Sequence, residues 1–389
     1  MFDYAAYAQK LREEIHMYPE IGYDLPRTLA VVRRELDAMG LSYTDKYCRS
    51  SLVATINEEK KGFTIGLRAD MDALPIQEEV DVPFRSRIDG QMHACGHDFH
   101  TAVLLAVAKY LVDHKDQLRC RVKLLFTPAE EYEDPGCKHM AENGVMDDVD
   151  CAVAIHVNSK AKVGEVQIND AGGTNGNSMG FKVDFYGKSA HAAAQYRGKD
   201  AILMAVDAIT AMEFMVAKEV DGRKCKVLNI GSIHGGKTNN VICDHVSMFG
   251  TLRTWDDDVN DYITARLQQI CENVATTCGG RADFRVVKFM PYNRNHPVMV
   301  EKLRASTAKI FGEKSIVQKP RTLGGEDFAF FSRIKPTVQF KVGVEPADAT
   351  EQIAGHNGKF RIDNGGFPIA IKVFTQFVFD NMDGIEFTE

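Results

Sequence analysis

The run of residues 92–100, Met-His-Ala-Cys-Gly-His-Asp-Phe-His, holds the residue types best able to do chemistry in this chain. Cys95 and His97 are two positions apart, so a thiolate and an imidazole can turn toward one point. Both groups are good ligands for a divalent transition metal. A cysteine nucleophile with a histidine base is the weaker alternative, because so short a spacing directs both groups at a metal rather than at each other. The pair alone does not establish a metal site, so its surroundings matter.

Two more groups that could bind a metal follow strand-like runs further along the chain. Glu130 and Glu131 come after the apolar run 121–126, and His156 follows the apolar run 151–155. Taken singly, the carboxylates could begin a solvated helix, where acidic groups are favoured, and the histidine could be a hydrogen-bonded core residue. In open α/β sheets, however, ligands bind beyond the carboxyl ends of the strands. Both positions therefore also suit a shared site.

A third strand-like run, residues 63–68, is almost wholly apolar, as expected for a strand buried on both faces. It leads into Asp70 and Asp72, which by themselves could cap a turn. If the three strands are parallel neighbours, their acidic and imidazole tips share one edge of the sheet with the Cys95 loop. It is improbable that the polar residues after three strands and those of the Cys95 loop would reach the same edge by chance. We therefore expect a convergent cluster of one thiolate, several carboxylates and two imidazoles.

The order of helical and strand-like patterns predicts two domains. Residues 1–175 and 290–389 alternate strands with helices, which indicates an α/β domain with a mixed, largely parallel sheet flanked by helices. Residues 176–289 follow the order strand-helix-strand-strand-helix-strand of a ferredoxin-like α+β unit, which we expect to be inserted in the first domain. The expected helices cover about 3–18, 26–39, 101–110, 201–217, 259–278, 298–311 and 367–379, and the expected strands cover 51–56, 63–68, 121–126, 151–157, 179–186, 226–233, 241–254, 282–289 and 337–344.

Composition and charge exclude several classes of protein. The hydrophobic share of 44% and the charged share of 26% are those of an ordinary globular protein. A net charge of −7 without a Lys/Arg block argues against a nucleic-acid partner, and the absence of a long apolar run argues against a membrane one. The nine cysteines have no paired spacing, and the acidic opening Met1-Phe2-Asp3-Tyr4 is unlike a signal peptide. We therefore expect reduced thiols and a cytoplasmic location.

Six motifs follow one another along nearly the whole chain. They are Leu67-Arg68-Ala69-Asp70-Met71-Asp72-Ala73-Leu74-Pro75, the run 93–100, Pro128-Ala129-Glu130-Glu131, Gly187-x-Ser189-Ala190-His191-Ala192, Gly324-Gly325-Glu326-Asp327-Phe328 and Gly355-His356-Asn357. In this order they resemble the M20 metallopeptidase family, most of all its amidohydrolase branch of hippurate hydrolases, aminoacylases, N-acetyldiaminopimelate deacetylases and auxin-conjugate hydrolases. The opening 16–20, His-Met-Tyr-Pro-Glu, is also similar to that branch. The resemblance implies a zinc-peptidase-like catalytic domain with an inserted lid or dimerisation domain.

The resemblance also implies a centre for two divalent metal ions per subunit. Carried over position by position, the family's ligands fall on Cys95, His97, Glu131, His156 and His356. The cysteine takes a bridging place that a carboxylate often fills in other branches. Thiolate and imidazole favour zinc, and the carboxylate also admits manganese, cobalt or nickel. We expect zinc or manganese first, with cobalt and nickel as alternatives.

Catalytic and supporting roles follow from the same resemblance. Glu130 matches the family's general acid/base, which takes a proton from the metal-activated water and returns it to the leaving amine. His191 matches a residue that reaches the partner subunit's site in a dimer and stabilises the oxyanion, although an ordinary loop histidine explains it equally well from the sequence alone. Asp72 matches an acidic residue that supports the ligands from behind and orients one of them.

Three further residues match family positions that hold the substrate: Asn240, Arg253 and Gly325. Arg253 suits a substrate carboxylate, which a guanidinium binds in bidentate fashion. Gly325 would allow a close backbone approach to the same group, though a plain turn also explains it. The segment 132–138, Tyr-Glu-Asp-Pro-Gly-Cys-Lys, departs from the branch, because it lacks the expected Gly-Gly-Ala and adds acidic groups near the pocket.

These observations predict a dimeric amidohydrolase that removes the acyl group from an N-acyl amino acid or splits a short peptide-like amide. The expected partners are a small-molecule substrate and a second copy of the chain, joined through the inserted domain. An N-acetyldiaminopimelate deacetylase and a dipeptidase are alternatives with the same chemistry. A metal-binding paralogue without turnover is the alternative of a different class, and the intact ligand set with Glu130 argues against it.

Overall fold

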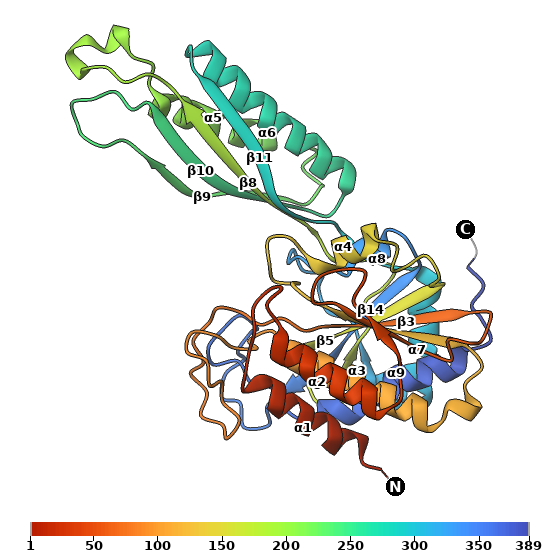
Figure 1. The fold of residues 1–389 in the computed structure, drawn as a ribbon. Helices are drawn as coiled ribbons and strands as arrows, with labels where there is room; N and C mark the ends of the chain where they lie inside the picture. Colours follow the sequence, from red (N-terminus) through yellow and green to blue (C-terminus); the bar gives the residue numbers. More distant parts are fainter. Residues whose placement is uncertain (1, 388–389) are drawn as a thin grey trace. The chain divides into compact units, whose positions relative to one another are not determined.

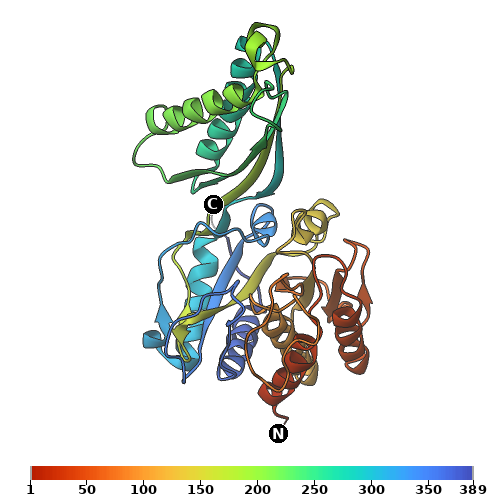
Figure 2. The same ribbon diagram turned by 90° about the vertical axis from the view of Figure 1, so that its left-hand side faces the viewer.

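The computed structural model describes residues 2–387, which divide into two compact units (Figures 1 and 2). The first unit comprises the chain up to Thr174, Arg294–Pro320 and the chain from Asp327, and the second comprises Asn175–Asn293 and Arg321–Glu326. We expected the whole of 290–389 in the first domain. The segment 321–326 instead groups with the second unit, because Thr322 accepts a hydrogen bond from the backbone of Gly176 and Leu323 accepts one from Arg253.

The first unit is built around one sheet in the order β1-β2-β4-β3-β5-β14-β6-β13. Its strands are β1 (Tyr43–Thr44), β2 (Leu52–Ile56), β3 (Thr64–Asp70), β4 (Arg121–Thr127), β5 (Cys151–Lys162), β6 (Val166–Gln167), β13 (Ile316–Val317) and β14 (Thr337–Glu345). The four central strands β4, β3, β5 and β14 are parallel, whereas β2 pairs with β4 and β6 pairs with β14 in antiparallel fashion. The expected α/β architecture with a mixed, largely parallel sheet is confirmed. All seven residues of β3 are buried, as its nearly continuous apolar run predicted.

Helices cover both faces of this sheet (Figures 1 and 2). One face carries α1 (Tyr4–His16), α2 (Pro26–Ala38), α3 (His97–Asp113), α7 (Pro297–Phe311) and α9 (Gly366–Asn381), and the other carries the short α4 (Gly136–Glu142) and α8 (Ala329–Ser332). Neighbouring side chains of β4 point alternately to the two faces of the sheet. Leu124 belongs to the apolar core under α3, and Leu125 packs in the separate core under α4. Among residues 2–387, no helix combines the length and the apolar character that crossing a bilayer requires.

Helix α3 begins at His97, four residues before the position expected from its apolar pattern. Its first turn is polar, and the pattern therefore did not reveal it, but all four residues 97–100 are buried in the structure. Gly96 precedes the helix with a φ of +86°, a conformation that favours glycine. A Cβ atom at this position would also lie 2.6 Å from Val157 Cγ2. The glycine thus brings the start of α3 against β5.

The second unit is a four-stranded antiparallel sheet in the order β11-β8-β10-β9, with two helices on one face (Figure 1). Its elements are β8 (Asn177–Tyr186), α5 (Ala201–Lys218), β9 (Lys226–Gly235), β10 (His245–Thr254), α6 (Asp257–Thr277) and β11 (Arg281–Met290). A separate small sheet pairs β7 (Gly172–Asn175) with β12 (Asn293–Asn295), and most residues of these two strands belong to the first unit. The chain order βαββαβ is the one expected. β10 begins later than predicted, because Val241 forms an isolated bridge with His191 instead.

Candidate metal centre

Three adjacent parallel strands carry the polar residues of the candidate site, as the sequence suggested. β3 lies between β4 and β5 and ends at Asp70. The apolar run 151–155 suggested that a strand ends at His156, but His156 lies inside β5. The strand continues because its pairing with β14 extends beyond His156, whereas the last pair with β3 joins Ala154 to Arg68. His156 therefore lies just past the edge where β3 stops.

The five residues that the resemblance identified as metal ligands lie together in the first unit and form two groups. In one group, the potential ligand atoms of Cys95, His97 and His156 all lie within 4.8 Å of one another. In the other, those of Cys95, Glu131 and His356 do so. The Cys95 Sγ atom is 3.5 Å from His156 Nε2, and His356 Nε2 is 2.9 Å from Glu131 Oε1. Because Cys95 belongs to both groups, its sulfur is placed where it could bridge two ions.

Asp72 holds the backbone of the acidic pair and one imidazole. Its Oδ1 and Oδ2 accept hydrogen bonds from the backbone N–H groups of Glu130 and Glu131, each at 3.0 Å. His97 Nδ1 lies 3.3 Å from Asp72 Oδ1. The other ring nitrogen of His97, Nε2, is buried, lies 3.8 Å from Asp70 Oδ1 and has no hydrogen-bond partner among residues 2–387. A carboxylate behind a histidine, with the far nitrogen left over, is the usual arrangement around a protein-bound metal.

Two residues at the site have a backbone conformation that is uncommon outside glycine. Ala129, directly before Glu130, has a φ of +58°, and His356 has a φ of +63°. Such residues are found where the surrounding structure enforces the conformation, often at functional sites. The backbone N–H of His356 also donates to Ala94 O at 2.8 Å, which ties its loop to the loop of Cys95.

Glu130 is buried and lies beside the ligand groups without belonging to either of those that contain Cys95. One of its carboxylate oxygens falls within 4.8 Å of ligand atoms of His97 and Glu131. Glu131 also belongs to the group with Cys95 and His356, whereas Glu130 does not. This arrangement leaves Glu130 able to act on a molecule held at the cluster.

Burial and nearby charges set the protonation of the ligand groups. Burial, with the Glu131 carboxylate, raises the pKa of the Cys95 thiol, so that the thiolate requires a cation close to it. Burial also keeps the pKa of His156 well below its usual range, which favours the neutral imidazole that binds metals. Burial opposes the charged form of His97 too, but Asp70 and Cys95 raise its pKa well above the ordinary value. A cation at Nε2 would take the place of that proton.

A second buried network contacts the residues of the site, and the sequence analysis anticipated only part of it. Arg68 Nη1 is 2.7 Å from Asp70 Oδ2, and Arg68 Nη2 donates to Asp327 Oδ1 at 2.5 Å. Asp70 Oδ1 accepts from His100 Nδ1 at 2.6 Å, and His100 Nε2 accepts from the backbone N–H of Val157 at 2.9 Å. Of this network, the sequence analysis pointed to Asp70 but missed His100. An arginine inside an otherwise apolar buried strand was the signal for this network.

With this geometry established, comparison with known proteins identifies the family. Residues 66–380 match the family model described as Peptidase family M20/M25/M40. The chain belongs to this family. The prediction made from the motifs is thereby confirmed.

Relatives of this M20 protein cover most of its length. N-acetyl-L-cysteine deacetylase of Bacillus subtilis (strain 168) is 33% identical over 321 residues, which are 82% of this chain and 76% of the relative. Thermostable carboxypeptidase 1 of Saccharolobus solfataricus is 33% identical over 364 residues, 91% of this chain and 90% of the relative. The crystal structure of the Bacillus subtilis YXEP protein, described as a dinuclear metal binding peptidase from the M20 family, is similar with a TM-score of 0.82 and 26% identity over 98% of this chain and 99% of that one. The protein is a metal-dependent hydrolase of amide or peptide bonds, as predicted.

The remaining residues assigned by the resemblance lie in the second unit of this M20 protein, in two pairs. His191 is exposed, its Nδ1 accepts from the backbone N–H of Ala193 at 3.1 Å, and the carbonyl of Asn240 accepts from Ala192 next to it. Arg253 on β10 is half-buried and donates to Ser178 Oγ and to Leu323 O.

Gly325 belongs to the second of these pairs. A Cβ atom at Gly325 would lie 3.3 Å from Ser178 Cβ, so this glycine packs on the same serine that Arg253 contacts. Burial lowers the pKa of Arg253.

Proposed function

We propose that this M20 protein is a two-metal amidohydrolase that cleaves the amide bond of N-acyl amino acids. The observation that carries the proposal is the cysteine shared by two ligand groups, with Glu130 outside both but beside them. The relative described as a dinuclear metal binding peptidase supports two ions per subunit. Thiolate and imidazole ligands favour zinc, and the carboxylate admits manganese, cobalt or nickel.

The chain's own residues would divide the chemistry. The metal ions, when bound, supply Lewis acidity and lower the pKa of a coordinated water toward neutrality. Glu130 takes a proton from the attacking water and delivers it to the nitrogen of the leaving amine, so that the amide C–N bond breaks as a new C–O bond forms. Asp72 keeps Glu130 and Glu131 in place through their backbone N–H groups. We assign oxyanion stabilisation to His191, on the resemblance.

The substrate class follows from what the relatives' names have in common. N-acetyl-L-cysteine is an amide whose amine side is an amino acid with a free carboxylate, and a carboxypeptidase also acts beside a free carboxylate. We assign the recognition of this carboxylate to Arg253, together with Asn240 and Gly325. The carboxypeptidase relative favours dipeptide cleavage as the second candidate.

We further propose that the protein is a homodimer joined through the second unit. The large apolar residues Ile202, Val206 and Phe214 of α5 are exposed, the last by 63%. They stand at four- and eight-residue intervals, so they form one stripe, and Leu203 extends it. The opposite side of α5 already fills the core of the unit with residues such as Met204 and Met212. A contiguous exposed apolar surface of this kind marks an interaction site.

A substrate panel with defined metals tests the proposed activity. The protein would be stripped of metal, reloaded with zinc, manganese, cobalt or nickel in turn, and assayed on N-acetyl and N-benzoyl amino acids, matching amides without the carboxylate, and dipeptides. We expect turnover of acyl amino acids and none of the amides that lack the carboxylate. Faster turnover of dipeptides would establish the second candidate. Two bound ions without turnover of any substrate would refute the enzymatic proposal and favour a binding protein.

A further inference from the structure

Asp98, the residue after the candidate ligand His97, is buried in the first turn of α3 and is held by two cations of α1. Its Oδ2 accepts from Arg12 Nε at 3.0 Å and from His16 Nδ1 at 2.7 Å. Arg12 and His16 are four residues apart, so both side chains project from one face of α1. Helices α1 and α3 are therefore joined by directional bonds at the turn that carries His97.

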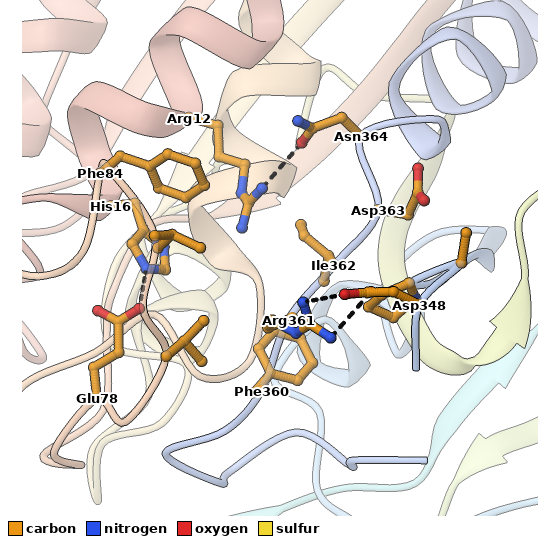
Figure 3. A pocket seen from close by; sticks show the side chains of 14 residues that line it. Arg12, His16, Glu78, Phe84, Asp348, Phe360, Arg361, Ile362, Asp363 and Asn364 are labelled. Carbon is orange, nitrogen blue, oxygen red and sulfur yellow. Dashed lines mark hydrogen bonds and ion pairs between the residues drawn. The ribbon is translucent and has the colours of Figure 1, made fainter. Parts of the chain in front are cut away.

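The two cations are themselves fixed by other parts of the chain. His16 Nε2 lies 3.2 Å from Glu78 Oε1, and the other oxygen of Glu78 accepts from the backbone N–H of Ser86 at 2.6 Å. Arg12 Nη1 donates to Asn364 Oδ1 at 3.1 Å. Figure 3 shows Arg12, His16 and Glu78 along the wall of a pocket of about 390 Å³.

The guanidinium of Arg12 lies over a ring from the same wall. Its Cζ is 5.3 Å from the centroid of Phe84. Arg12 and His16 thus contact Asp98 directly, and Glu78 and Asn364 are linked to Asp98 through them.

Packing alone does not explain why charges are used here. Helix α1 already buries Ala8, Leu11 and Ile15 in the main core, which holds it against α3 without polar contacts. Burying charged groups carries a large desolvation cost, and well-packed apolar residues often hold elements together as firmly. What apolar contacts lack is direction. Two charge-assisted hydrogen bonds to one carboxylate oxygen fix the rotation of the first turn of α3.

The opposite side of the same turn is fixed as well. His100 donates to Asp70 at the end of β3 and accepts from Val157 on β5, next to His156. Around the helix axis, at about 100° per residue, His97 projects between Asp98 and His100, and it is itself bonded to Asp72. The turn is therefore held to the sheet through His100 and to α1 through Asp98.

We infer that Arg12, His16 and Asp98 are positioning residues that aim His97 at one of the two metal ions, the one held by Cys95, His97 and His156. This inference rests on the two-metal site of the proposed function and adds residues that do not touch the ions. It has a selective consequence. The second group, Cys95 with Glu131 and His356, is held by Asp72 and by the loop of His356. Disturbing Arg12 should therefore weaken the binding of the ion at the first group and leave the binding of the other ion unchanged.

The test measures zinc affinity by competition with a chelator in two single-site backgrounds of the full chain. His356→Ala leaves the group that contains His97, and His156→Ala leaves the group that contains Glu131. Arg12→Met removes the charge but keeps the length of the side chain. We expect it to lower zinc affinity about 10–100-fold in the His356→Ala background and to leave it nearly unchanged in the His156→Ala background.

Two further variants separate positioning from stability. Leu11→Ala, on the same helix, removes buried apolar contacts without touching Asp98, and should lower Tm while leaving zinc affinity at both groups intact. Arg12→Lys keeps one charged donor, so it should fold even if Arg12→Met fails to fold, and it should recover part of the lost affinity. The absorption spectrum of the cobalt-loaded protein provides an independent readout, and only the Arg12 variants should alter it.

The outcomes are distinguishable. A wild-type protein that binds fewer than two ions refutes the proposed function and this inference with it. A wild-type protein that binds two ions, with Arg12→Met and Arg12→Lys equal to it in affinity and spectrum, refutes the inference alone. Equal losses from Leu11→Ala and Arg12→Met would also refute it, because the effect would then be one of general stability.

Discussion

Replacing Asp72 by asparagine should damage the candidate metal centre without changing the shape of the side chain. In the native structure both carboxylate oxygens accept, one from the backbone of Glu130 and one from that of Glu131, and Oδ1 also faces His97 Nδ1. Asparagine offers one acceptor and one donor group in the same space. Its NH₂ group would therefore face a backbone N–H, and one buried donor would lose its partner.

The magnitude follows from these contacts. An unsatisfied buried donor costs about 1–3 kcal/mol, and each remaining bond weakens by roughly 1 kcal/mol when the acceptor loses its charge. With one donor unsatisfied and two bonds weakened, we expect the free energy of unfolding of the apo-protein to fall by about 3–5 kcal/mol in total. Loss of the carboxylate behind His97 should lower metal affinity about 10–100-fold, which corresponds to about 1.4–2.7 kcal/mol.

Urea unfolding of the apo-protein and zinc competition of the folded protein measure these two effects separately. Asp45→Asn is the matched control, because Asp45 is exposed and pairs with Arg33 at the surface. This control should behave as the wild type in both assays. An Asp72→Asn protein with unchanged unfolding midpoint and zinc affinity would show that the contacts of Asp72 do not organise the site.

Four further changes have expected outcomes. Glu130→Gln should lower kcat about 10²–10⁴-fold and leave two ions bound, as measured by steady-state kinetics and metal analysis. Burial disfavours the charged form of His16, but Asp98 and Glu78 raise its pKa above the ordinary 6.5. The imidazolium therefore stabilises the fold fully below pH 6.5, and this contribution is lost as pH rises through the folded-state pKa. Urea midpoints between about pH 5.5 and 8.5 should accordingly fall more steeply for the wild type than for His16→Gln. Chelation should lower Tm and added zinc should restore it, with about 2.7 kcal/mol of stabilisation per ion at 100 times its Kd. Phe214→Glu should convert the dimer to monomer in sedimentation velocity.

Controls for these changes come from the same chain. Glu133→Gln alters an exposed acid close to Glu130 in sequence and should keep normal turnover. Ile334→Glu places the same charge at an exposed apolar residue of the first unit, so it should not affect a dimer formed through α5. A monomeric wild type would contradict the proposed dimer, and a Tm insensitive to chelation would contradict a metal-supported fold. Parallel pH curves for wild type and His16→Gln would contradict the ionic role of His16.

The long strands of the first unit, β3, β4, β5 and β14, were predictable because their signal is local. An apolar run such as that of β3 requires burial on both faces, and runs of this kind separated by helices require a parallel sheet. The polar residues at the ends of β3 and β4 then share one edge. The start of α3 was not predictable in this way, since its first turn is polar and is buried only by the site around it.

His156 shows a related limit. The apolar run ends before it, which suggested the end of a strand, but β5 continues because β14 pairs with it further along. Which neighbour extends a strand depends on residues almost two hundred positions away. Likewise, the segment 321–326 reads as part of the α/β domain but groups with the second unit, where it contacts Arg253.

The amino-acid sequence by itself determined the kinds of groups available for chemistry, their order along the chain and the family motifs that contain them, because residue type and short-range spacing are properties of the chain alone. Tertiary structure alone decided that Asp72 binds the backbone of both glutamates and that α1 reaches Asp98. These are contacts between segments tens to hundreds of residues apart. They form only when burial of the apolar faces brings the segments together, and no local pattern encodes which polar groups then meet.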